Sequence, residues 1–232
     1  MPRDVGVILV AGGKGQRLGG AVAKQFQSIA GQPMLLRALR PFTSHPEVCQ
    51  VAVVLPAAAL VAPPEWLAGL AGDLVTLVAG GSERMDSVEN GLTRLRAECT
   101  VVLSHDAARP FVSREIIDAV VAHARRGEGA IAARRVSDTL KAEKMEEGAR
   151  LISGTLPREG VWRAQTPQGF PRQLLHDAFG KARQSGLNGT DEAQLVERLG
   201  QRIHLVADTV WNLKVTTSDD LLLAELIARR ET

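Results

Sequence analysis

The chain has 232 residues, 45% of them apolar, which is enough to bury one full core. Its 28 basic and 26 acidic residues leave a net charge of +2, which excludes a bulk electrostatic attraction to nucleic acid or to membranes. No apolar run reaches the ~18 residues of a membrane span, and the N-terminus enters a strand without a signal segment. We therefore expect one cytoplasmic domain over residues 1–232, with Cys49 and Cys99 as reduced thiols.

The first predicted element is a buried parallel strand over residues 5–10, which ends in a glycine-rich turn. Because Gly12, Gly13 and Gly15 lack a Cβ, their backbone N–H groups can approach phosphate oxygens, with Arg17 and Lys24 following as cations. The sequence lacks the Gly-x-x-x-x-Gly-Lys-Ser/Thr pattern of a Walker loop. It also lacks the third glycine of the dinucleotide-binding fingerprint. Two interpretations stay open for this turn: a polyphosphate-binding loop, and an ordinary flexible loop.

Strands and helices then alternate, as in parallel β-α-β winding. The pattern predicts a helix over 33–42 stopped by Pro41, a strand over 48–55, a short helix from Pro63 to Leu70 and a strand over 74–78. A second glycine turn, Gly80-Gly81, follows, and Ser82 is the expected cap of the next helix. Such a turn falls beside the first at the carboxyl edge of the sheet, where open α/β folds bind ligands.

A fourth strand over 100–103 runs into Asp106 and Arg109. A salt-bridged turn explains this pair equally well when it is considered alone. Beside a triphosphate loop, however, Asp106 is placed to supply the carboxylate that a phosphate-bound Mg²⁺ ion takes from a protein. His105 is expected to be an orienting or packed histidine and not a metal ligand, because no second His or Cys lies at metal-ligand spacing.

The next segment predicts a helix from Ser113 to Ala124 and a strand over 130–133. Two short strands joined by a polar turn then predict a projecting hairpin at about 134–161. Because an isolated two-stranded arm is marginally stable in water, we expect it to pack on a second subunit.

The rest of the chain predicts helices over 171–185 and 191–199, the second capped by Thr190, and an edge strand over 203–206. A strand over 210–216 contains Lys214, whose burial is costly unless it meets an anion, and a phosphate is favoured over a carboxylate. Ser218 is the expected cap of a last helix over 221–230. Thr139, Arg158 and Thr166 are candidate anion or hydroxyl ligands, although each alone is more often a turn residue.

Several motifs cover nearly the whole chain in a fixed order: Ala11-Gly12-Gly13-x-Gly15-x-Arg17, Lys24-Gln25, Gly80-Gly81, Asp86-Ser87-Val88, His105-Asp106-Ala107-Ala108-Arg109-Pro110, Asp138-Thr139, Thr166-Pro167-Gln168, Thr190-Asp191-Glu192-Ala193 and Asn212-Leu213-Lys214-Val215-Thr216. Each motif is weak alone, but the ordered combination resembles the 2-C-methyl-D-erythritol 4-phosphate cytidylyltransferase family. The resemblance implies a doubly wound, mostly parallel α/β nucleotidyltransferase fold and a homodimer built through the arm. It also implies transfer of CMP from CTP to methylerythritol phosphate, with Mg²⁺ and release of pyrophosphate.

The resemblance further implies a role for each matched residue. Arg17, Lys24 and Lys214 would stabilise the triphosphate and the transition state, and Asp106 would orient Mg²⁺. Arg109, Thr166 and Thr190 would face the acceptor substrate, with Thr139 and Arg158 reaching it from the partner's arm. The nucleotide-binding residues would be Ala11, Gly12, Gly13, Gly15, Gly81, Ser82, Ser87 and Ala107.

Departures from the family pattern are modest, and Ser82 stands where an acidic residue is frequent. Two rival functions remain: a cytidylyltransferase for another polyol phosphate such as ribitol 5-phosphate, and a catalytically silent nucleotide-binding module. Retention of Arg17, Lys24, Asp106 and Lys214 together argues against the silent module, because binding alone tolerates the loss of transition-state cations.

Overall fold

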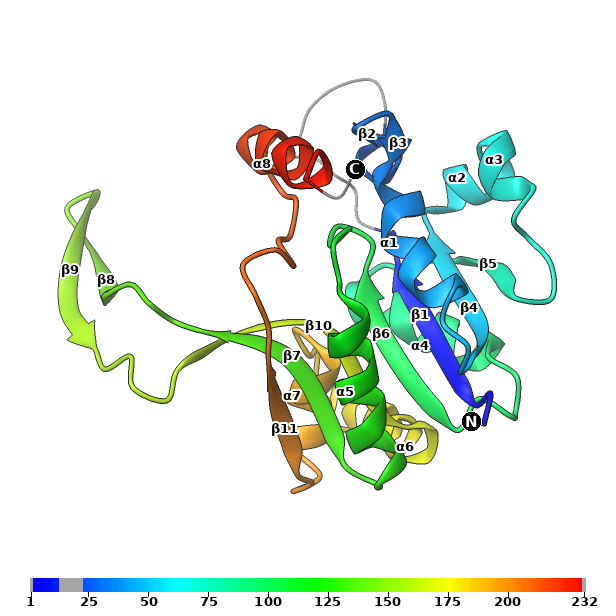
Figure 1. Cartoon of the computed structure of the whole chain (residues 1–232). Helices are drawn as coiled ribbons and strands as arrows, with labels where there is room; N and C mark the ends of the chain where they lie inside the picture. The colour runs from blue at the N-terminus through cyan, green and yellow to red at the C-terminus, as the bar shows by residue number, and fades with distance from the viewer. Residues whose placement is uncertain (1, 13–22, 231–232) are drawn as a thin grey trace.

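The computed structural model describes residues 2–12 and 23–230, which form an α/β fold around one seven-stranded sheet (Figure 1). The strand order is β11-β7-β10-β6-β1-β4-β5, and β10 runs antiparallel to both of its neighbours while the other pairs are parallel. This confirms the expected doubly wound, mostly parallel sheet. The strands are β1 (Val5–Val10), β4 (Val48–Leu55), β5 (Val75–Ala79), β6 (Val101–Asp106), β7 (Gly129–Arg135), β10 (Trp162–Pro171) and β11 (Ile203–Ala207).

Helices cover both faces of the sheet, which is why the central strands are mostly apolar. Every residue of β4 is buried, and alternate residues of β1 enter different cores. Val7 packs on the face covered by α1 (Met34–Thr43) and α5 (Arg114–Arg125), whereas Ile8 packs on the opposite face. That second face is covered by α4 (Arg84–Arg94), α6 (Arg172–Ser185) and α7 (Glu192–Glu197).

The parallel strands bring distant parts of the chain to one edge of the sheet. Val10 of β1 lies opposite Val54 of β4 and Asp106 of β6, and Leu55 lies opposite Ala79. The chain leaves β1 toward β4 and β5 and later returns to β6 on the other side of β1. Reversals of this kind leave a crevice at the carboxyl ends of the strands.

Several predicted helix boundaries are wrong, among them the helix predicted from Pro63 to Leu70, which spans only Glu65–Ala68. Helix α1 continues past Pro41 to Thr43, because only the last turn lies beyond the proline and few backbone bonds are lost there. Glu83 rather than Ser82 is the N-cap of α4, and the side chain of Asp86 accepts from the Glu83 N–H at 3.0 Å. Asp191, not Thr190, caps α7 by accepting from the Gln194 N–H.

The predicted hairpin is present and projects away from the sheet (Figure 1). Its strands are β8 (Leu140–Glu146) and β9 (Ala149–Leu156), and both are mostly exposed. The predicted strand over 210–216 is absent, and this stretch is an irregular connection to α8 (Ser218–Ala228), which Thr217 caps in place of Ser218. The smaller elements are η1 (Lys24–Phe26), β2 (Ser28–Ile29), β3 (Gln32–Pro33), α2 (Ala57–Val61) and α3 (Glu65–Ala68).

Candidate active site

A cavity of about 570 Å³ lies at the carboxyl edge of the sheet. It is formed by the ends of β1 and β6, the turn before α4, η1 and the irregular segment before α8. These segments are far apart in sequence, and the sheet topology brings them together. The lining includes nine of the candidate residues: Ala11, Gly12, Lys24, Gly81, Ser82, Ser87, Asp106, Ala107 and Lys214.

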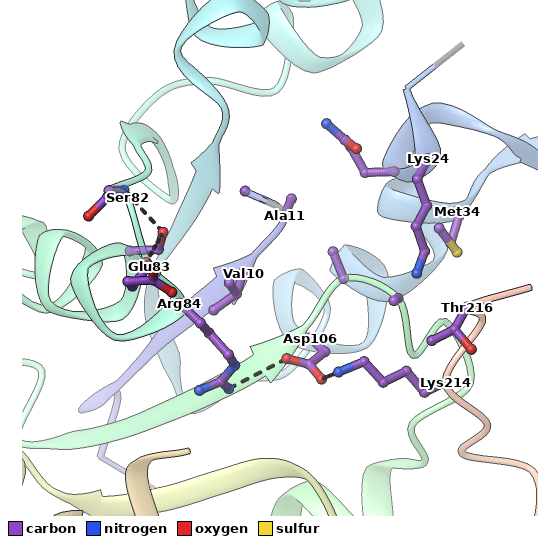
Figure 2. A pocket seen from close by; sticks show the side chains of 16 residues that line it. Val10, Ala11, Lys24, Met34, Ser82, Glu83, Arg84, Asp106, Lys214 and Thr216 are labelled. Atoms are coloured by element: carbon purple, nitrogen blue, oxygen red, sulfur yellow. Dashed lines mark hydrogen bonds and ion pairs between the residues drawn. The ribbon is translucent and has the colours of Figure 1, made fainter. Parts of the chain in front are cut away.

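Asp106 is the carboxylate at the centre of this site. Its side chain is 11% exposed, and it contacts Lys214 Nζ at 2.7 Å and Arg84 at 3.4 Å, with Arg109 Nε at 3.9 Å. Arg84 and Lys214 approach it from opposite sides (Figure 2). Burial raises the pKa of Asp106, but the cations Arg84, Lys214 and Arg109 outweigh burial and hold that pKa well below its usual range. Asp106 is therefore ionised at neutral pH.

Lys214 meets this carboxylate rather than sitting inside a strand. Its side chain is 44% exposed and lies on the irregular segment before α8. In the structure the anion beside Lys214 is thus a carboxylate, and the predicted contact with a phosphate stays a prediction. Asp106 lies close enough to neutralise the ammonium group directly.

Arg84 and Glu192 are two charged site residues that the sequence analysis did not single out. Glu192 is buried and accepts from the Arg84 guanidinium at 2.5 and 3.1 Å, and the Ser104 hydroxyl donates to the same carboxylate. Burial lowers the pKa of Arg84, but the Glu192 and Asp106 carboxylates more than compensate and raise it. The signal for Arg84 was its place directly after the second glycine turn. The pairing with Glu192, 108 positions away, follows only from the fold.

The second glycine turn holds its shape through side chains of the following helix. Ser87 Oγ accepts from the Gly81 N–H at 3.1 Å and donates to the Glu83 carbonyl at 3.0 Å. A Cβ on Gly81 would lie 2.2 Å from Asp86 Cβ, so only glycine fits there. Ser82 donates to Asp86 Oδ2 at 2.6 Å, and this bond, with one from Arg183, lowers the pKa of Asp86 to about 2.

Lys24 lies on η1 and points toward the same cavity (Figure 2). Three other candidates of the first glycine turn, Gly13, Gly15 and Arg17, lie outside the described residues. Their predicted roles therefore stay predictions.

A second cavity of about 710 Å³ lies beside the first and shares Lys214 and Thr216 with it. Arg109 lines this cavity, is 8% exposed, and donates to the Asn212 carbonyl at 2.8 Å. Thr166 lies behind Asp106 and accepts from its backbone N–H at 3.0 Å.

His105 has an orienting place, as expected. Its Nε2 lies 3.0 Å from the Arg109 carbonyl, which can only accept, so Nε2 carries the proton and the Thr166 hydroxyl donates to Nδ1. Burial lowers the pKa of His105 to about 4, so the ring is neutral near pH 7.

Three acceptor-site candidates lie away from both cavities. Thr139 and Arg158 are exposed at the base of the hairpin, where Arg158 donates to the Ser137 carbonyl. Thr190 is exposed next to α7 and donates its backbone N–H to Gln194 at 2.8 Å. Within the described parts of this one subunit, these three do not join the cavity residues.

Comparisons with known proteins agree with this fold and identify its family. A family model described as 2-C-methyl-D-erythritol 4-phosphate cytidylyltransferase matches residues 5–230. The enzyme of that name from Syntrophus aciditrophicus is 39% identical over 237 residues, covering 100% of this chain and 98% of its own length. The one from Geobacter metallireducens is 37% identical, with 97% of each chain covered. The crystal structure of the enzyme of that name from Thermus thermophilus matches with a TM-score of 0.81 and 35% identity over 97% of this chain and 99% of that one.

The fold and the cation-lined cavity at the sheet edge thus define a nucleotidyltransferase. Within that class, the chain belongs to the 2-C-methyl-D-erythritol 4-phosphate cytidylyltransferase family. Among the described helices, none is long and apolar enough to cross a membrane.

Proposed function

We propose that this chain transfers CMP from CTP to 2-C-methyl-D-erythritol 4-phosphate and releases pyrophosphate, as a cytoplasmic step of isoprenoid precursor biosynthesis. The observation that supports this most directly is the convergence of Lys24, Arg84 and Lys214 on the cavity that holds Asp106. A triphosphate and an attacking phosphate repel each other, so a site for this reaction must gather cations around the α-phosphorus.

The chemistry asks for positioning and charge neutralisation rather than a covalent intermediate. The nucleophile is already a phosphate oxygen anion near neutral pH, so a strong general base is not needed. Lys214 would move from Asp106 to the α-phosphate, while Lys24 and Arg17 would neutralise the leaving pyrophosphate. The backbone of the two glycine turns, at Gly12 and Gly81, would line the nucleotide, because glycine has no side chain to keep a ligand away.

Asp106 fits the magnesium ion that this reaction uses. It is a carboxylate at the cavity wall, a hard oxygen donor, and the cations around it keep it ionised. Magnesium ions bound to nucleotides usually take one or two protein carboxylates and keep the phosphates as their other ligands. The ion, when bound, neutralises phosphate charge.

The second cavity suits the acceptor phosphate. Arg109, Arg134 and Arg163 line it, and Lys214 connects it to the first cavity. Trp211 and Leu223 supply an exposed apolar rim. A polyol phosphate held there would place its charged end among guanidinium groups and its oxygen near the nucleotide.

The projecting hairpin supports the proposal of a homodimer. Its exposed apolar residues, Met145, Ile152 and Leu156, gain burial only against another surface. Thr139 and Arg158 at its base do not line either cavity described in this subunit, so a partner's cavity is the site that they would complete. Static light scattering should give twice the mass of the 24.9 kDa chain, and a monomeric mass would contradict the arrangement.

The reaction is tested by pyrophosphate release from CTP with Mg²⁺ and one acceptor at a time. We expect turnover with methylerythritol phosphate and little with ribitol 5-phosphate. Turnover with ribitol 5-phosphate but not with methylerythritol phosphate would mean that the proposed acceptor is wrong. No turnover with either acceptor would contradict the proposed catalytic activity. Arg17→Ala should lower kcat about 100-fold or more with folding intact, whereas His176→Ala, at an exposed site on α6, should match the unchanged protein.

A further inference from the structure

Three metal-ligand side chains meet at the sheet edge opposite the cavity. His123 comes from the last turn of α5, Glu128 from the turn before β7, and His204 from the edge strand β11. Glu128 Oε2 lies 2.8 Å from His204 Nε2 and 3.8 Å from His123 Nδ1. The two imidazole rings stack with centroids 4.0 Å apart and an interplanar angle of 27°.

The geometry of His204 distinguishes this cluster from an ordinary hydrogen-bonded group. Its Nε2 is buried and has no hydrogen-bond partner among the described residues, although Glu128 Oε2 is only 2.8 Å away. The two atoms are therefore close without pointing along a donor-to-acceptor line. Two ligands of one cation show this relation, because each points at the ion instead of at the other.

The spacings agree with a single ion. Tetrahedral ligands about 2.0–2.1 Å from a zinc ion lie about 3.3 Å from one another. The 2.8 Å and 3.8 Å separations lie on either side of that value, and all three ligand atoms are within 4.8 Å of one another. Small side-chain rotations would bring both separations to the value expected for a zinc site.

We propose that His123, Glu128 and His204 bind one divalent transition-metal ion of the zinc type, with water in the fourth position. Two imidazoles and a carboxylate favour such an ion over Mg²⁺, which prefers oxygen ligands. The three side chains are 24%, 27% and 39% exposed, so the cluster lies at the surface of the protein. The bound ion would fasten the end of α5 to the edge strand β11, away from the nucleotide cavity.

Arg126 is the group that competes with the ion. Its guanidinium lies 2.8 Å from His123 Nδ1, so a cation already occupies the side of that ring where the metal would bind. Arg126 is exposed and caps the end of α5, so its side chain can turn into solvent. Replacement of Arg126 by alanine should therefore tighten metal binding several-fold.

The test uses the full-length protein stripped with a chelator and titrated with zinc chloride alone. Calorimetry should give one zinc ion per chain, and a 100-fold excess over Kd should raise Tm by roughly 5–10 °C. His204→Ala and Glu128→Gln should each weaken binding at least 10-fold, while His176→Ala on α6 should bind as the unchanged protein does. Circular dichroism checks that each variant is folded.

Two results would overturn the proposal. One is a folded wild-type protein that binds no zinc with a Kd below about 10 μM. The other is unchanged zinc binding in folded His204→Ala, which would place the ion elsewhere, for example on Cys49 and Cys99. If His204→Ala does not fold, zinc binding by Glu128→Gln gives the same test. That variant is expected to fold because Glu128 lies outside the helices and strands.

Discussion

Replacement of Glu192 by glutamine should destabilise the fold by breaking the ion pair with Arg84. Loss of one partner of a fully buried pair costs about 3–5 kcal/mol. Here the Glu192 side chain is 1% exposed, but that of Arg84 is 27% exposed and keeps Asp106 at 3.4 Å. We therefore expect a decrease of about 2–3 kcal/mol in the free energy of unfolding, which lowers Tm by roughly 5–10 °C for a chain of this size.

A double-mutant cycle measured by urea denaturation tests this reasoning. Arg84→Met removes the stranded cation, so the double variant should be about 2 kcal/mol more stable than the sum of the single changes predicts. Glu89→Gln is the matched control, because its pair with Arg183 is exposed and should contribute less than about 1 kcal/mol. A Glu192→Gln protein as stable as wild type, or additive single changes, would refute the buried-pair interpretation.

Three further changes separate catalysis, acceptor binding and stability. Lys214→Met should lower kcat by about 10²–10³ in the pyrophosphate assay and change the free energy of unfolding by less than about 1 kcal/mol, because Lys214 is half exposed; a folded variant with near-normal turnover would contradict its role. Arg158→Ala should mainly raise the KM for the acceptor, and a mixture with Lys24→Ala should regain activity if subunits share sites; a mixture without regained activity would count against sharing. His105→Asn should flatten the pH dependence of stability, because the folded pKa of about 4 lies below the ordinary 6.5 and the unfolded chain takes up the proton first. The wild type should therefore lose up to about 3 kcal/mol as pH falls from 6.5 to 4, and equal slopes for both proteins would contradict this.

Six strands of the sheet were predictable from the sequence because their signals are local, whereas the antiparallel strand β10 was not predicted. Buried strands such as 48–55 are continuous apolar runs, and the glycine turns mark where they end. The Val210–Thr216 prediction failed because an apolar, β-branched run also suits a segment that packs irregularly: Val215 is fully buried under α8 without a strand partner among the described residues. The prediction that Pro41 ends the helix failed because a proline in the last helical turn removes few backbone hydrogen bonds.

The site was predictable only in part, since a sequence identifies the charged residues but not which of them pair. Asp106 was expected at the cavity from its place at the end of a strand, and it is there. The Arg84–Glu192 pair joins two helices on one face of the sheet, and the fold alone brings them together. The proposed roles of Thr139 and Arg158 would need a second subunit, whose position no pattern within one chain predicts.

The two carboxylates of the site differ in burial, and that difference assigns them different roles. The Glu192 side chain is buried and holds Arg84 in a fixed position, because breaking that pair would leave a charged group with little solvent around it. Asp106 borders the cavity, and its partner Lys214 is 44% exposed on a segment that forms no strand among the described residues. Because Arg84 also lies beside Asp106, an arriving triphosphate can draw Lys214 away without leaving that carboxylate unpaired. The exchange would leave an ionised carboxylate oxygen facing the phosphates, where the proposed Mg²⁺ ion would bind.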